Sequence, residues 1–147
     1  MEIGIGDLRR GLRMIRLARR YHAASEIRYI GVDLFEAGPR SETAAVSLKQ
    51  AYRMLRATGA RVHLIPGDAV QSLVRSANAL PGNELVLVSA ERVVERLGEA
   101  WHYIPRMLSP AAMLYAAEAN GAKTVWRKLP PSTLPSLAPA ASHRRAA

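Results

Sequence analysis

Apolar residues along this chain repeat alternately at helical and at strand spacing. In the helical stretches they recur every three or four positions, and in the strand stretches they form short runs that end at turn residues. The pattern predicts helices whose apolar faces cover 8–21, 45–55, 70–77 and 94–108, and strands over 27–35, 61–65, 84–88 and 112–117. Pro105 must bend or end the fourth helix, because its ring removes a donor and clashes with the preceding turn.

Capping and turn residues set the expected boundaries of these elements. Asp7, Ser41 and Asp68 are each suited to accept the free N–H groups at a helix start. Asn120-Gly121 favours a tight hairpin, so the last strand, over 123–129, should run antiparallel to its neighbour.

Strands that alternate with helices predict an α/β fold with an open, doubly wound, mostly parallel Rossmann-like sheet and a C-terminal antiparallel hairpin strand. We expect one domain over residues 1–129. From Pro130 onward the composition changes to Pro, Ser and Ala. Residues 130–147 bury too little apolar surface to offset their ordering entropy, so we expect a disordered tail there.

The composition limits the class of protein. The chain has 147 residues, 49% of them apolar, but it contains no run long enough to cross a bilayer and no apolar core of a signal peptide. We therefore expect a cytoplasmic protein with no membrane partner. The chain has no cysteine, which excludes disulfides, thiolate metal sites and cysteine nucleophiles.

The net charge of +9 raises the question of an anionic partner such as nucleic acid. The basic residues fall into two separate helical stripes and a basic tail: Arg9, Arg13, Arg16 and Arg20; Lys49, Arg53 and Arg56; Arg144 and Arg145. Arginine on solvated helix faces gives the same count, and only 5% of the residues are aromatic. The charge therefore favours a solvated surface over a nucleic-acid site.

Four polar or glycine-containing segments lie at, or directly after, the carboxyl ends of the predicted strands. They are the turn with Gly4 and Gly6, Asp33, Gly67-Asp68, and Ser89-Ala90-Glu91. In a parallel sheet these positions meet at the carboxyl edge, where ligands bind in α/β folds. The sequence therefore predicts a nucleotide-type site at this edge.

The same segments resemble motifs of the class I S-adenosylmethionine-dependent methyltransferases over roughly residues 2–129. Glu2-Ile3-Gly4-Ile5-Gly6 looks like the first motif of that family, and Ile30-Gly31-Val32-Asp33 like the second. Pro66-Gly67-Asp68-Ala69 is similar to the third motif. Glu84–Glu91 and Met107–Leu114 are similar to the fourth strand and to the turn before the fifth. The last part is most similar to small-molecule O-methyltransferases.

This resemblance implies S-adenosylmethionine as the cofactor. Asp33 would hold the ribose hydroxyls, Gly4 and Gly6 would let the main chain approach the methionine part, and Glu2 would attract the ammonium through water. Asp68 would accept from the adenine amino group and Ala69 would donate from its backbone. Helix capping alone explains Asp68 equally well.

Ser89 completes the set of cofactor-binding residues that the resemblance implies. It stands where metal-dependent O-methyltransferases have an aspartate, and a serine is a poor ligand for a divalent ion, so we expect no catalytic metal. Transfer to a small-molecule oxygen nucleophile requires removal of a proton, for which Glu91 and His102 are the candidate general bases. A histidine on a solvated helix surface is the alternative interpretation of His102.

The family fold places its first strand at the centre of the sheet, and here only Met1, Glu2 and Ile3 precede the glycine turn. We therefore expect either a domain truncated at its N-terminus or a start that lies upstream, with cofactor affinity and activity weakened in the first case. Two alternatives remain open. One is a nicotinamide-dinucleotide-binding domain, although Leu8 stands where a third glycine is expected. The other is a non-catalytic basic module for RNA or protein.

Overall fold

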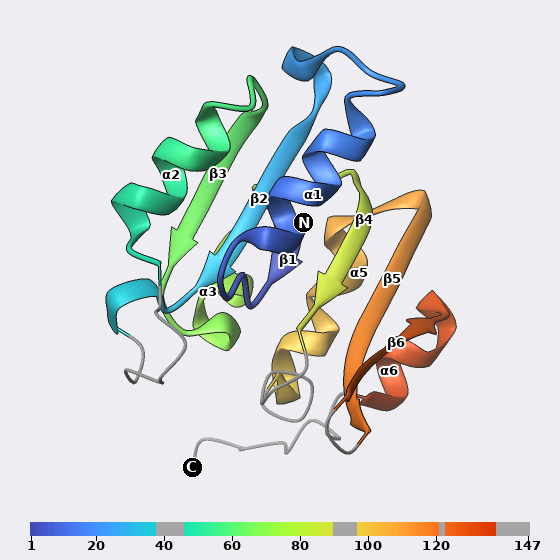
Figure 1. The fold of residues 1–147 in the computed structure, drawn as a ribbon. Coiled ribbons are helices and arrows are strands. Elements are labelled where there is room, and N and C mark those ends of the chain that lie inside the picture. The colour runs from blue at the N-terminus through green and yellow to red at the C-terminus, as the bar shows by residue number, and fades with distance from the viewer. Residues whose placement is uncertain (38–45, 90–96, 121–122, 138–147) are drawn as a thin grey trace.

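A six-stranded sheet forms the centre of the computed structural model, which describes residues 1–37, 46–89, 97–120 and 123–137. The strand order is β3-β2-β1-β4-β5-β6, and neighbouring strands are parallel except for β6, which runs antiparallel to β5 (Figure 1). The strands are β1 Glu2–Ile3, β2 Arg28–Asp33, β3 Arg61–Pro66, β4 Asn83–Val88, β5 Leu108–Asn120 and β6 Lys123–Leu129. The expected α/β class, the mostly parallel sheet and the antiparallel last strand are confirmed.

Helices cover both faces of the sheet (Figure 1). On one face α1 and α2 pack over β1, β2 and β3, and their buried residues share one apolar cluster with Tyr29 and Ile5. On the other face α3, η3, α5 and α6 surround a second cluster that contains Trp101. The α-helices are α1 Arg9–Ala18, α2 Leu48–Arg56, α3 Ala69–Ser76, α5 Ile104–Met107 and α6 Leu134–Leu137; the 3-10 turns are η1 Ala24–Glu26, η2 Phe35–Ala37, η3 Gly98–His102 and η4 Pro131–Thr133. Among the described helices, none is long and apolar enough to cross a membrane.

The central strand β1 has only two residues, yet it pairs with both of its neighbours. Glu2 lies opposite Gly31 of β2 and Leu87 of β4. Ahead of β1, the first halves of β2 and β4 border a cavity of about 570 Å³. The Met1 ammonium lies at this cavity and donates to the Leu85 carbonyl at 2.7 Å. Burial lowers the pKa of that ammonium from its ordinary 8.0 to about 6.

The long fourth helix expected over 94–108 is not formed in the described residues. From Leu97 the chain instead makes the 3-10 turn η3 and the one-turn helix α5, with Pro105 in the first turn of α5. The apolar face was predicted correctly, because Leu97, Trp101 and Ile104 are all fully buried. The spacing therefore identified which residues face the core, and the local backbone adopts a tighter turn than an α-helix.

Strand β5 is longer than the expected 112–117 at both ends, and Ser109-Pro110, expected to form the turn into this strand, lies within its first residues. The pairing with β4 shifts register between Asn83 and Leu85, where the partner on β5 moves from Leu108 to Met113. The extra residues of β5, among them Pro110, lie in this irregular part of the pairing. A proline is tolerated in a strand at such an irregularity.

The tail expected to be disordered from Pro130 onward is partly ordered. Residues 131–137 form η4 and α6, and the Leu134 side chain is fully buried in the cluster of η3 and α5. This corrects the expected domain boundary, since one well-placed leucine compensates for the low apolar content around it. Residues 138–147 lie outside the described residues.

Two expected helix caps are also corrected. Helix α2 is capped by Ser47, whose hydroxyl accepts from the Gln50 N–H at 3.2 Å, and Ser41 lies outside the described residues. At α1 the capping position is Leu8, although Asp7 accepts from the Arg9 N–H at 3.1 Å.

Candidate functional site

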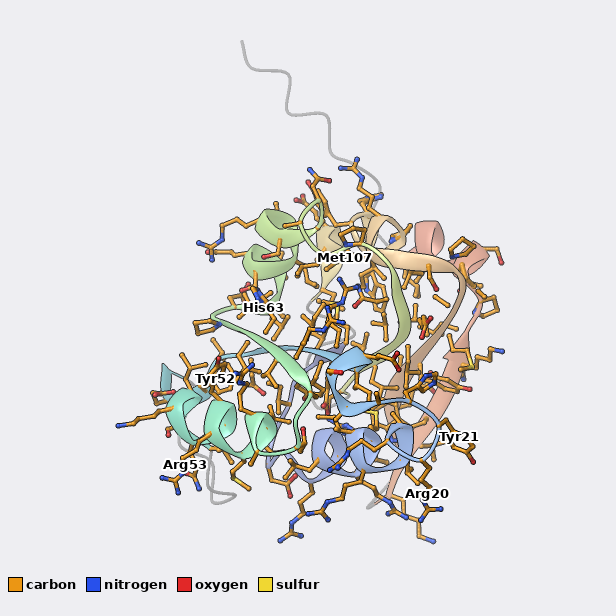
Figure 2. All side chains as sticks on the ribbon, turned by 90° about the horizontal axis from the view of Figure 1, so that it is seen from above. Arg20, Tyr21, Tyr52, Arg53, His63 and Met107 are labelled. Atoms are coloured by element: carbon orange, nitrogen blue, oxygen red, sulfur yellow. The ribbon has the colours of Figure 1, made fainter. Side chains whose placement is uncertain are left out.

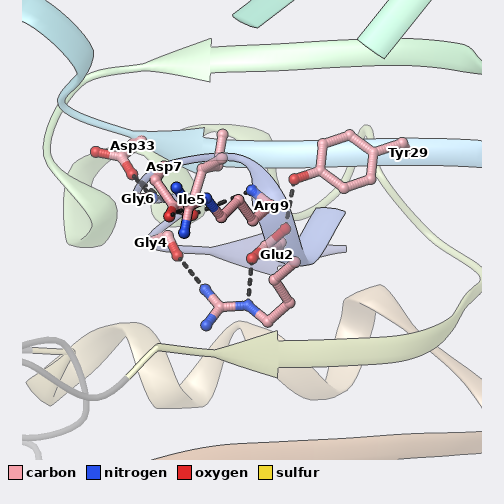
Figure 3. A network of polar contacts seen from close by, with 9 residues as sticks. Glu2, Gly4, Ile5, Gly6, Asp7, Arg9, Tyr29 and Asp33 are labelled. Atoms are coloured by element: carbon pink, nitrogen blue, oxygen red, sulfur yellow. Dashed lines mark hydrogen bonds and ion pairs between the residues drawn. The ribbon is translucent and has the colours of Figure 1, made fainter. Parts of the chain in front are cut away.

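The glycine turn after β1 is tied to the end of β2. Gly4 and Gly6 adopt φ angles of +81° and +61°, which few other residues tolerate. The Gly4 N–H donates to the Val32 carbonyl at 2.8 Å. The Ile5 and Gly6 N–H groups then donate to the same Asp33 oxygen, Oδ2, at 2.6 and 3.0 Å (Figure 3). The turn is therefore held in one conformation by the Asp33 carboxylate, for which the resemblance implies a role in binding the ribose.

Leu8 occupies a left-handed conformation with φ +66° at the start of α1. A third glycine was expected here, but the G-x-G-x-x-G spacing counted from Gly4 and Gly6 places it at Arg9, so that assignment is corrected by one position. The conformation costs about 1–2 kcal/mol for a residue with a Cβ. The fully buried Leu8 side chain offsets this cost by packing into the cluster under α1 and α2.

Asp33 connects three of the segments that were expected to form the site: the glycine turn, the end of β2 and the end of β3. It is the last residue of β2 and is partly exposed. Its Oδ2 holds the glycine turn, and its backbone carbonyl accepts from the Gly67 N–H at the end of β3 at 2.9 Å. Among the described residues, its Oδ1 has one long contact, to the Phe35 N–H at 3.4 Å. One carboxylate oxygen thus builds the site, and the second has accepting capacity for a ligand.

Glu2 does not face the site. Its side chain is fully buried, and its two oxygens accept from Arg10 Nε and from the Tyr29 hydroxyl, each at 2.5 Å (Figure 3). Burial raises the pKa of the Glu2 carboxyl, while Arg10 and Tyr29 act in the opposite direction. Because both oxygens are used inside the protein, the implied role of Glu2 toward a ligand ammonium does not fit this arrangement.

Gly11 makes this buried cluster possible. A Cβ at Gly11 would lie 2.6 Å from the Tyr29 hydroxyl and 3.0 Å from Glu2 Oε2. Helix α1 can therefore approach β1 and β2 closely only because position 11 has no side chain. Sequence analysis missed this residue, although a glycine inside a helical pattern often signals a close approach.

A cavity of about 270 Å³ opens beside the glycine turn at the carboxyl edge. Arg10 forms one wall, with its guanidinium 4.8 Å from the centre of the Trp126 ring on β6. The same guanidinium also donates to the Gly4 carbonyl at 2.9 Å. The cavity is lined by Ile5, Gly6, Asp7, Arg10, Ser89, Thr124 and Trp126.

Arg10, Thr124 and Trp126 were not predicted from the sequence. Arg10 lies one position outside the arginine stripe of α1, which is the signal that could have separated it from the solvated arginines. Thr124 and Trp126 are two residues apart on β6, so their side chains lie on the same face of the sheet. Both line the same cavity as Arg10. Nothing local in the sequence indicates that β6 contributes to a site at the glycine turn.

The remaining expected residues are divided between the site and other places. Ser89 lines the cavity, and its N–H donates to the Ile3 carbonyl at 2.8 Å. Asp68 is exposed and caps α3 by accepting from the Gln71 N–H at 3.1 Å, with Ala69 as the first residue of that helix. The capping interpretation of Asp68 is thus confirmed.

Of the two candidate general bases, the structure describes only His102, and it does not lie at the cavity. His102 is exposed on η3 and lines neither the cavity at the carboxyl edge nor the larger one ahead of β1. Glu91 lies outside the described residues. Within the described ranges, no group of three or more His, Asp or Glu side chains is arranged to hold a metal ion.

The two cavities lie at opposite edges of the sheet. The larger one is at the amino ends of β2 and β4, whereas the glycine turn, Asp33 and Ser89 meet at the carboxyl ends. Ligands of open α/β sheets bind at the carboxyl ends, so the smaller cavity is the candidate site. Comparisons of the chain with protein-family models, with curated proteins and with solved structures found no match.

Proposed function

We propose that this chain is a Rossmann-like domain that binds S-adenosylmethionine at the carboxyl edge and transfers its methyl group. The observation that carries the proposal is Asp33, whose Oδ2 accepts from the glycine turn and whose Oδ1 has one long contact within the residues that the structure describes. A carboxylate in that position is suited to accept from ribose hydroxyls. The strand order, with β1 between β2 and β4, supports the same proposal.

Arg10 extends the proposed binding site toward the methionine part of the cofactor. Its Nε and one terminal nitrogen are bonded to Glu2 and Gly4, but a guanidinium has five N–H donors. The donors that remain at the cavity wall would bind the methionine carboxylate, a role that the resemblance does not assign. The cavity volume of about 270 Å³ lies just below the range for small-molecule sites, which begins at about 300 Å³.

The sulfonium of the cofactor supplies an activated methyl group, so the protein contributes mainly binding and alignment. The glycine turn, Asp33 and Arg10 would fix the donor, and Trp126 and Thr124 would form the wall against which an acceptor lies. Small molecules with an oxygen nucleophile are the acceptors to be assayed first, because the resemblance implies that class.

Isothermal titration calorimetry with S-adenosylmethionine and S-adenosylhomocysteine tests the proposal. Both should bind the wild-type chain, and Asp33→Ala should abolish binding, whereas Glu118→Gln, in an exposed ion pair with Arg127, should not. Absence of binding to the wild type, or unchanged affinity in Asp33→Ala, would refute it. A spectroscopic titration with reduced nicotinamide dinucleotide tests the alternative cofactor at the same edge.

A further inference from the structure

The two basic stripes of the sequence lie on one side of the molecule. Helices α1 and α2 cover the same face of the sheet, because their buried residues share one apolar cluster (Figure 1). Seen along the sheet, Arg20 and Arg53 point away from it at opposite ends of this layer (Figure 2). We call this surface the α1–α2 basic face; its exposed cations include Arg13, Arg16, Arg20, Lys49, Arg53 and Arg56.

Within the described residues, no acidic side chain forms an ion pair with these cations. Neither α1 nor α2 contains an acidic residue. In the part of the chain that the structure describes, the ion pairs are those of Arg9, Arg10 and Arg127, so none of the six cations named above has an acidic partner there. Their positive potential therefore adds over one face instead of cancelling within it.

Exposed aromatic rings accompany the cations at both ends of this face. Tyr21 follows Arg20 directly and its side chain is 83% exposed. Tyr52 is 46% exposed, and the Arg56 guanidinium lies 5.9 Å from the centre of its ring. Figure 2 shows Tyr21 near Arg20 at one end of this face, and Tyr52 and Arg53 on different sides of α2 at the other. The low aromatic content of the chain therefore hides a local arrangement in which tyrosines and cations lie together.

We propose that the α1–α2 basic face binds single-stranded nucleic acid. Guanidinium groups bind phosphates through paired N–H donors, and exposed rings provide stacking platforms for unpaired bases. Arginine predominates over lysine on both helices, which favours phosphate recognition over a diffuse attraction. This proposal does not depend on the ligand site, since its cations point away from the sheet while Arg10 points to the cavity.

Fluorescence anisotropy with a labelled single-stranded RNA of about 12 nucleotides tests this proposal on the full chain. The wild type should bind this RNA. The double variant Arg13→Gln/Arg16→Gln should bind at least about tenfold more weakly. It should also reduce the slope of log affinity against log salt concentration by about 1.4, or about 0.7 for each lost phosphate contact. The matched control is Arg75→Gln combined with Arg106→Gln on α3 and α5. It removes the same charge from the opposite face and should leave the affinity within about twofold.

Tyr21→Ala separates base stacking from general attraction to charge. It leaves the net charge unchanged, and loss of one stacking platform should weaken RNA binding about tenfold. Equal weakening by both double variants, or no effect of Tyr21→Ala, would overturn the proposal. Binding to vesicles with anionic lipid in the absence of binding to RNA would overturn it as well, and would assign the face to a membrane surface.

Discussion

Replacing Arg10 with methionine tests the buried cluster on which the candidate site is built. Glu2 is fully buried, with 0% of its surface accessible to solvent. Its cationic partner is Arg10, whose Nε lies 2.5 Å from Glu2 Oε1. Removing the cation leaves a buried carboxylate with only the Tyr29 hydroxyl, which typically costs about 3–5 kcal/mol. The lost bond to the Gly4 carbonyl adds about 1 kcal/mol.

A double-mutant cycle with Glu2→Gln isolates the charge pair from the other contacts of Arg10. A neutral amide at position 2 can still accept from Tyr29, so Arg10→Met should cost at least about 2 kcal/mol less in the Glu2→Gln background. Urea denaturation followed by circular dichroism gives the four free energies of unfolding. The matched control is Arg9→Met, whose side chain is 90% exposed and whose pair with Asp7 should contribute under about 1 kcal/mol.

The same variant should depend on pH in a defined direction. Burial already raises the pKa of Glu2, and loss of Arg10 removes the largest opposing influence, so the pKa rises further. A raised carboxyl pKa in the folded state contributes stability at low pH that is lost as the pH rises through that value. Arg10→Met should therefore be less damaging at about pH 5 than at about pH 7.5. A cost below about 1 kcal/mol, or equal costs in both backgrounds, would refute this account of the cluster.

Three further perturbations test other parts of the structure. Acetylation of the Met1 amine removes a group whose pKa is lowered on folding from 8.0 to about 6, so its charge makes the free energy of unfolding fall as the pH drops from 8 toward 6. This difference in pKa corresponds to about 2.7 kcal/mol. Urea titrations should therefore show that acetylation stabilises the protein at about pH 5.5 and has little effect at about pH 9. Gly11→Ala should lower the melting temperature measured by calorimetry, because the new Cβ would lie 2.6 Å from the Tyr29 hydroxyl. The control is Ala57→Gly at the exposed end of α2, which should lower the free energy of unfolding by no more than about 1 kcal/mol. Leu134→Ala should cost about 2–5 kcal/mol in urea denaturation if α6 is part of the core, and no change would contradict the packing of that helix.

The elements that sequence analysis predicted best are those with an unambiguous local signal. The run Leu85-Val86-Leu87-Val88 is apolar on both faces, and β4 lies between two parallel neighbours as expected. Asp33 was placed at the end of a strand by the turn that follows it, and it is the last residue of β2. Because parallel strands bring their carboxyl ends to one edge, the meeting of Asp33 with the glycine turn could be predicted without coordinates.

What the sequence could not predict depends on contacts between distant segments. In the sequence, Arg10 cannot be distinguished from the exposed arginines around it. Its different environment comes from two contacts: the buried Glu2 carboxylate, and the Trp126 ring of β6 at the far edge of the sheet. Leu134 lies in a stretch with the composition of a disordered tail, and its order comes from packing against η3. The two arginine stripes were interpreted as separate because sequence spacing does not show that α1 and α2 cover the same face.

The most direct test of the proposed ligand site is a two-dimensional amide NMR titration with S-adenosylmethionine. Binding at the carboxyl edge should shift the amide signals of Ile5, Gly6 and Ser89, which lie at the glycine turn and the cavity. The signal of Leu85, at the opposite cavity, should stay in place. Shifts confined to Leu85 and its surroundings, or no shifts at saturating cofactor, would contradict the account.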